Sequence, residues 1–168
     1  MRLAYQSGSN NDKLFRNQSL LDEHYGKYGQ EIADVLGDSN YWKVGINMHI
    51  EEINWLDIGE EEAVLKVVSD ADCLICFSCP CSYNVGDVLV EPLECLDTEN
   101  IILCERTENI IEKMEGEFKY KLRGELKNME KGIVEVKGFA LHIDEDKIPK
   151  DVSNGMCIQF EVSRIDIW

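Results

Sequence analysis

Hydrophobic residues recur at two different spacings along this chain, and the two spacings predict different elements. From Leu20 to Leu36 the apolar residues lie three or four positions apart, which is typical of one face of a helix. Ser19 is a candidate N-cap for this segment, and Gly37 is a candidate C-terminal stop. We therefore expect a helical segment over residues 10–37.

From residue 41 onward the pattern changes to alternation, which is typical of strands with one buried face. Val44, Ile46, Met48 and Ile50 share one parity, and Ile53 and Trp55 follow after a break in the register. This break predicts a strand that is long and bent. Further strands are predicted over residues 72–81, 88–90, 118–127, 134–136, 139–143 and 158–162.

Two other segments fit a helix. Residues 60–69 contain valines that would also suit a strand, but Glu60, Glu61 and Glu62 stand at the start, where a helix dipole stabilises negative charge. We therefore favour a helix over this segment. A second helix is expected over residues 105–115, because its apolar residues fall on one helical face.

These elements predict a single α+β domain over residues 1–168, helical over 10–37 and β-rich over 41–168. Its short strands are separated by turns and are mostly joined locally, which favours an antiparallel curled sheet or a small OB-like barrel. The run GIVEVKGFALHI followed by IPKDVSNGMCIQFEV resembles the last strands of an OB-type barrel. The N-terminal helical segment would cover one face or end of the sheet.

Charge is concentrated in the middle of the chain. The formal net charge is −16, yet the stretch from Val44 to Glu105 alone has fourteen acids against the single base Lys66, a net of −13. The rest of the chain has 16 bases and 19 acids, a net of −3. Such a field either keeps the protein soluble or presents a surface to a basic partner. It argues against nucleic acid as a ligand, since phosphate binding needs clustered Lys and Arg.

Four of the seven cysteines, Cys73, Cys76, Cys79 and Cys81, follow the spacing C-x-x-C-x-x-C-P-C. Thiolates from one loop can hold an iron–sulfur cluster at such a spacing. The residues between them are mostly apolar, however, and in a strand Cys76 would point away from the other three. We interpret the four as core thiols and expect no metal and no cofactor. A metal or redox site built on them is the alternative.

No motif for nucleotide binding or for nucleophilic catalysis occurs in the sequence, and His24, His49 and His142 lie far apart. We therefore expect no catalytic residue and a protein that is not an enzyme. The chain has neither an apolar leader nor an uncharged apolar run of about 18 residues. This predicts a cytoplasmic protein that does not associate with membranes.

In small size, acidity, lack of catalytic motifs and mixed sheet-plus-helix build, the chain resembles the bacterial immunity proteins of contact-dependent and related polymorphic toxin systems. The resemblance implies a non-enzymatic inhibitor that binds and neutralises a cognate toxin, such as a basic nuclease domain, through acidic side chains. The acids assigned to toxin binding are close in sequence, where the first strand leaves the sheet: Glu51, Glu52, Asp57, Glu60, Glu61 and Glu62.

Two further readings stay open. The alternating bases Lys119, Lys121, Arg123 and Lys127 form the wet face of a strand, and this face is either a second interface or the counter-ion of nearby acids. The alternative function is an OB-like barrel that binds a small molecule or a protein.

Overall fold

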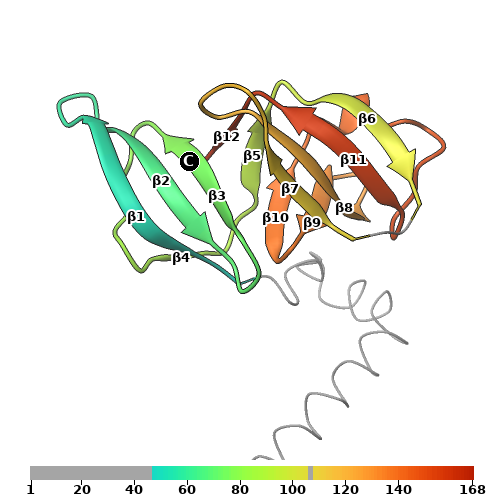
Figure 1. Cartoon of the computed structure of the whole chain (residues 1–168), viewed down its shortest axis with the longest axis horizontal. Helices are drawn as coiled ribbons and strands as arrows, with labels where there is room; N and C mark the ends of the chain where they lie inside the picture. Colours follow the sequence, from blue (N-terminus) through green and yellow to red (C-terminus); the bar gives the residue numbers. More distant parts are fainter. Residues whose placement is uncertain (1–46, 106–107) are drawn as a thin grey trace, which may run out of the picture. The chain divides into compact units, whose positions relative to one another are not determined.

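A computed structural model describes residues 47–105 and 108–168, which form a twelve-stranded sheet (Figure 1). The elements are β1 (Met48–Asp57), β2 (Glu62–Val68), β3 (Cys73–Ser78), β4 (Val88–Leu89), β5 (Leu93–Leu96), β6 (Glu99–Cys104), β7 (Ile110–Lys113), β8 (Tyr120–Asn128), β9 (Ile133–Val136), β10 (Phe139–His142), the short 3₁₀ helix η2 (Glu145–Lys147), β11 (Cys157–Val162) and β12 (Arg164–Asp166).

The α+β class predicted from the sequence is wrong, because the described residues hold strands and one 3₁₀ helix but no α-helix. The two helices expected at 60–69 and 105–115 are replaced by β2 and β7. In β2, buried and half-buried residues alternate, which is the pattern that β-branched residues favour on a pleated surface. The helical segment expected over 10–37 lies outside the described residues.

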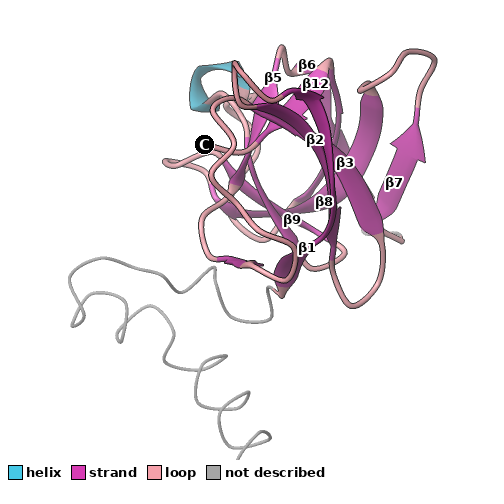
Figure 2. Ribbon diagram, turned by 90° about the vertical axis from the view of Figure 1, so that its left-hand side faces the viewer, coloured by secondary structure: helices cyan, strands magenta, loops and turns pink. Residues whose placement is uncertain are grey.

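The sheet is curled around a shared interior, as Figure 2 shows. The strand order is β4-β1-β2-β3-β12-β5-β10-β9-β8-β11-β6, and β7 pairs with β8 beside this path. Most neighbours are antiparallel, as predicted, but β12 runs parallel to β3 and β10 runs parallel to β5. The sheet is therefore mixed, and its two parallel contacts join segments that are distant in sequence.

The core lies inside the curl and is almost entirely apolar. Its largest fully buried side chains are Met48, Ile50, Leu65, Leu74, Leu93, Leu122, Leu126, Phe139, Leu141, Ile143, Ile158 and Phe160. Most of these residues have the inward parity that the alternation predicted. Burying side chains of this size contributes about 1.5–3 kcal/mol each, which is the main favourable term for folding.

The predicted long strand with a register break is confirmed in β1 from Met48 onward, and its expected start at Val44 lies outside the described residues. Its register with β2 shifts between Ile50 and Glu52 and again between Trp55 and Asp57. A bulge of this kind bends a strand and increases its twist. Before the first shift β1 is packed into the core, and after it most residues are exposed.

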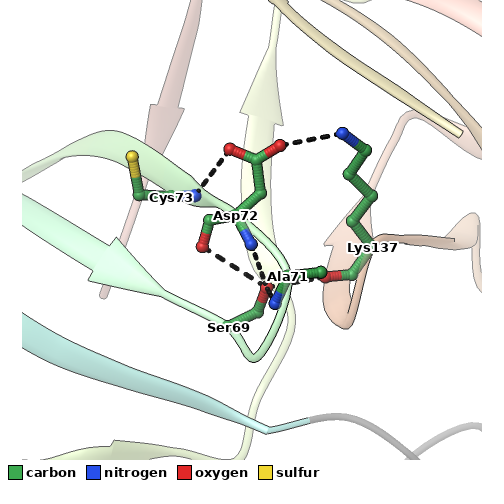
Figure 3. Close-up of polar contacts among 5 residues, drawn as sticks. All are labelled: Ser69, Ala71, Asp72, Cys73 and Lys137. Atoms are coloured by element: carbon green, nitrogen blue, oxygen red, sulfur yellow. Dashed lines mark hydrogen bonds and ion pairs between the residues drawn. The ribbon is translucent and has the colours of Figure 1, made fainter.

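The tip of the β2–β3 hairpin is tied to the turn between β9 and β10 (Figure 3). The Ser69 hydroxyl donates to the backbone carbonyl of Lys137 at 2.6 Å and accepts from the N–H groups of Ala71 and Asp72 at 3.3 and 3.2 Å. The Asp72 carboxylate accepts from the N–H of Cys73 and pairs with the Lys137 ammonium, both at 2.9 Å. These contacts hold the β2–β3 hairpin, and β1 paired beside it, against the turn between β9 and β10.

The Asp72 carboxylate is stabilised in its charged form at this contact. Burial acts to raise its pKa, but the hydrogen bonds from Lys137 and Cys73 and the charge of Lys137 outweigh burial and hold the pKa below its usual value. A second link to the same region comes from the buried Tyr120 of β8, whose hydroxyl accepts a hydrogen bond from the N–H of Ile75 at 3.0 Å.

Candidate interaction surface on the β1–β2 hairpin

The six acids assigned to toxin binding lie on one hairpin, formed by β1, a short turn and β2 (Figure 1). Glu51 and Glu52 lie at the first register shift of β1, and Asp57, Glu60, Glu61 and Glu62 surround the turn. All are exposed except Glu62, which is half-buried. The hairpin thus brings the acids together because they are close in sequence.

The turn of the hairpin is held by its own polar groups. One carboxylate oxygen of Asp57 accepts hydrogen bonds from the N–H groups of Gly59 and Glu60 at 2.8 and 3.1 Å. Glu61 has a left-handed backbone with φ of 56°, and its carbonyl accepts a hydrogen bond from the N–H of Cys81 at 2.8 Å. Asp57 therefore shapes the turn, a role that favours Asp and Asn in loops.

The acids fall into two electrostatic groups. At the base of the hairpin, Glu51 forms an ion pair with Lys66, and the hydrogen bond and charge of Glu51 raise the pKa of that lysine. Glu52 accepts a hydrogen bond from Asn54 at 3.0 Å. At the turn, by contrast, none of the acids forms an ion pair with any base in the described part of the chain.

This unpaired charge acts on Cys79, the thiol that lies against the turn. Cys79 Sγ is 3.7 Å from the carbonyl oxygen of Glu60. Burial and the carboxylates of Glu62, Glu60 and Glu61 raise the pKa of Cys79. The turn is thus a concentrated source of negative potential, which disfavours a second negative charge beside it.

Three large apolar side chains are exposed on the same hairpin. Trp55, Leu56 and Ile58 are 46%, 58% and 78% exposed, respectively. Sequence reasoning missed this group, since it placed Trp55 with Ile53 on the buried face. The signal was the run Trp55-Leu56-Asp57-Ile58, in which apolar residues occur at both parities and cannot share one dry face. Neighbouring exposed apolar residues typically mark a contact surface.

Within residues 47–105 and 108–168, no strand pairs with the outer edge of β1 beyond His49. β4 pairs with β1 only at Met48 and His49, whereas β2 pairs along the opposite edge as far as Asp57. Two register shifts interrupt this open edge, and bulges of this kind discourage indiscriminate pairing with another strand. Recognition here is therefore expected to use side chains more than a continuous backbone ladder.

The cysteine cluster does not form a ligand set. Cys76 and Cys81 are buried, as expected for core thiols, whereas Cys73 and Cys79 are half-buried. Burial raises the pKa of Cys76 far above its usual value. Within residues 47–105 and 108–168, no three His, Cys, Asp or Glu side chains are placed to hold a metal ion.

The basic face of β8 is partly covered by neighbouring polar groups. Arg123 donates a hydrogen bond to Gln159 of β11 at 2.7 Å, and Lys127 pairs with Glu125 at 3.0 Å. The flanking Lys119 and Lys121 are half-buried. Of these contacts, the one between Lys127 and Glu125 joins a base to an acid, so the counter-ion interpretation is supported for Lys127.

Of the histidines, His142 contacts Glu94 at 2.7 Å across the parallel β10–β5 pair, His49 is half-buried in β1, and His24 lies outside the described residues. No helix in the described part of the chain has the length and apolar character needed to cross a membrane.

Comparison with known proteins returns no relative: no family model, no curated protein and no solved structure matches this chain.

Proposed function

We propose that this chain is a non-enzymatic binding protein that recognises a basic protein through the β1–β2 hairpin, as an immunity protein recognises its toxin. The observation that carries this proposal is the exposure of Trp55, Leu56 and Ile58 beside the acids of the turn, none of which forms an ion pair with a base in the described residues. Solubility alone explains the acids but not the apolar side chains beside them.

The apolar group supplies the affinity in this proposal. Protein interfaces typically have a few aromatic or aliphatic side chains at their centre, and a polar rim that excludes water from them. Trp55 is the strongest candidate anchor because tryptophan is enriched among the residues whose truncation costs a complex at least about 2 kcal/mol. Leu56 has the opposite parity to Trp55 and is exposed on the other face of the strand, and Ile58 is exposed in the turn.

The acids supply partner choice and encounter rate. Between residues 51 and 62 the chain has six acids and no base. A cluster of one sign accelerates the approach of an oppositely charged protein and opposes partners of like charge. A basic nuclease domain fits this surface, because its substrate groove must be positive to bind phosphate.

The test is binding of the full chain to a basic toxin-domain protein encoded beside it, measured by surface plasmon resonance at several salt concentrations. We expect the association rate to fall as salt rises, since salt screens exposed charges. Trp55→Ala is expected to weaken binding at least about 30-fold, mainly through faster dissociation. Ile102→Ala changes an exposed apolar residue of β6, at the other end of the strand order, and is the matched control that is expected to have no effect.

A second variant separates charge from apolar contact. Combining Glu60→Gln, Glu61→Gln and Glu62→Gln is expected to slow association about tenfold at low salt and to have little effect at high salt. The charge-matched control combines Asp144→Asn, Glu145→Gln and Asp146→Asn, which remove the same number of acids at a different surface. Equal effects of the two triple variants, or an association rate insensitive to salt, would show that the hairpin is not the binding surface.

A further inference from the structure

Two cysteines that sequence reasoning did not pair lie directly opposite each other on neighbouring strands. Cys104 of β6 and Cys157 of β11 are register partners in an antiparallel ladder. Their sulfur atoms are 3.5 Å apart, and the Cys104 thiol also lies 3.5 Å from the Cys157 carbonyl oxygen. Among the described cysteines, this is the one pair with a thiol–thiol hydrogen bond.

The backbone at this position already fits a disulfide. Residues directly opposite each other in an antiparallel pair have Cα atoms about 4.5–5.5 Å apart, and disulfides span Cα separations of about 4.4–6.8 Å. Small rotations of the two side chains would therefore bring Cys104 and Cys157 into bonding distance. No strand has to move.

The pair is also reachable from solvent. β6 pairs with β11 along one edge only, and no other described strand covers its second edge. The two cysteines line a shallow surface hollow with Leu103, Glu105 and Met156. Cys104 is the more accessible of the two, since it is half-buried whereas Cys157 is buried.

We propose that Cys104 and Cys157 form a site of reversible oxidation by peroxides. The Cys104 thiolate attacks one peroxide oxygen, the O–O bond breaks, and water leaves after protonation, so that Cys104 becomes a sulfenic acid. Cys157 then loses its proton and attacks that sulfur, forming the S–S bond and releasing a second water. The two thiols together give up two electrons, and the peroxide accepts them.

The groups around Cys104 slow its oxidation, so we expect the pair to react under sustained exposure to peroxide. Burial and the hydrogen bond to Cys157 raise the pKa of Cys104 to about 11, while the positive charge of Arg123 acts in the opposite direction. Glu105 follows β6, and Glu125 lies opposite Cys157 on β8, so acids also surround the pair. Below this pKa the thiolate fraction, and with it the oxidation rate, is expected to rise about tenfold per pH unit.

The bond would hold an edge strand in place. Cys104 and Cys157 are 53 positions apart, and closing a loop of this length restricts the unfolded chain. We expect the melting temperature of the oxidised protein to rise by roughly 5–10 °C over that of the reduced protein. Reduction by a dithiol should reverse the shift.

The experiment treats the fully reduced full-length chain with hydrogen peroxide and then maps its peptides by mass spectrometry. We expect the number of free thiols to fall from seven to five, with a linked peptide pair containing Cys104 and Cys157. In Cys157→Ser, the sulfenic acid on Cys104 should persist and react with dimedone. Cys73→Ser, another half-buried cysteine in a strand, is the matched control and should oxidise like the wild type.

Two results would overturn the proposal. The first is a wild-type map in which Cys104 and Cys157 stay reduced while other thiols oxidise. The second is linkage of Cys104 to a different cysteine. Both are read from the wild-type protein, so the test holds even if a serine variant fails to fold.

Discussion

The two longest strands of the sheet, β1 and β8, show how pairing controls burial. β8 has nine residues, and its inward side chains are buried along nearly its whole length. It has strands on both edges, with β11 on one side and β7 and β9 on the other. β1 has ten residues and is fully buried only as far as Ile50, one residue beyond His49, the last residue that pairs with its second neighbour β4.

Similar sequence patterns therefore have different outcomes in the two strands. Ile53 and Trp55 of β1 have the inward parity, as Leu122 and Leu126 of β8 do, yet only the pair in β8 is fully buried. Alternation decides which face a side chain points to, but neighbouring strands decide whether that face is covered. β8 thus contributes mainly to stability, whereas most residues in the outer half of β1 are exposed.

The largest expected difference in stability is between two leucine-to-alanine variants, one in each strand. Leu122→Ala removes a fully buried side chain and is expected to lower the free energy of unfolding by about 3 kcal/mol, through lost burial and a cavity. Leu56→Ala removes an exposed side chain and should change it by less than about 0.5 kcal/mol. Urea denaturation followed by circular dichroism measures both. Similar losses in the two variants would contradict the contrast between the strands.

The next largest difference in stability is between two glycine-to-alanine variants, one in β8 and one in the β1–β2 turn. A Cβ at Gly124 of β8 would lie 2.1 Å from the carbonyl oxygen of Glu135 in β9, so Gly124→Ala is expected to cost about 2 kcal/mol of stability. At Gly59, in the β1–β2 turn, the nearest atom to an added Cβ would be a carboxylate oxygen of Asp57, at 3.3 Å. Gly59→Ala should therefore be much milder in the same denaturation assay.

The smallest effect concerns the contact between the tip of the β2–β3 hairpin and the turn between β9 and β10. Asp72→Asn removes the ion pair with Lys137, and because this contact is partly exposed we expect a loss of about 0.5–1 kcal/mol at pH 7. The folded state lowers the pKa of Asp72, so its stabilisation is present above the usual pKa and is lost as pH falls through the folded value.

The pH dependence gives this third prediction its control. The difference in unfolding free energy between wild type and Asp72→Asn should shrink below about pH 4. Asp70→Asn changes an exposed carboxylate two positions away, which accepts from Asn47 and does not contact Lys137. If the two variants lost the same stability with the same pH profile, the contact with Lys137 would not be the cause.

Much of the sheet could be predicted because alternation directly determines the faces of a strand. β3, β8, β9, β10 and β11 all overlap segments whose apolar residues alternate or form a short buried run. The prediction failed at 60–69, where the acids were interpreted as the start of a helix. In the structure Glu60 donates its backbone N–H to the Asp57 carboxylate and Glu61 has a left-handed backbone, so both belong to a turn. β5 and β6 were not predicted, because β5 is short and β6 has exposed apolar residues of both parities.

The candidate site was predictable only in part. Six acids close in sequence were bound to stay close on any hairpin, so their grouping follows from the chain itself. The exposure of Trp55 depends on β4 ending early, and the pairing of Cys104 with Cys157 depends on β6 meeting β11. Both are consequences of tertiary pairing between distant segments, which a local pattern does not contain.

The position of β12 has a consequence for how this sheet forms. Arg164–Asp166 lies between β3 and β5, so the last of the described strands is inserted at the middle of the strand order. The two halves of the sheet order are therefore joined only after the other described strands have been synthesised. Pairing between distant segments loses chain entropy before the new contacts stabilise the fold. We therefore expect the domain to fold in milliseconds to seconds rather than microseconds.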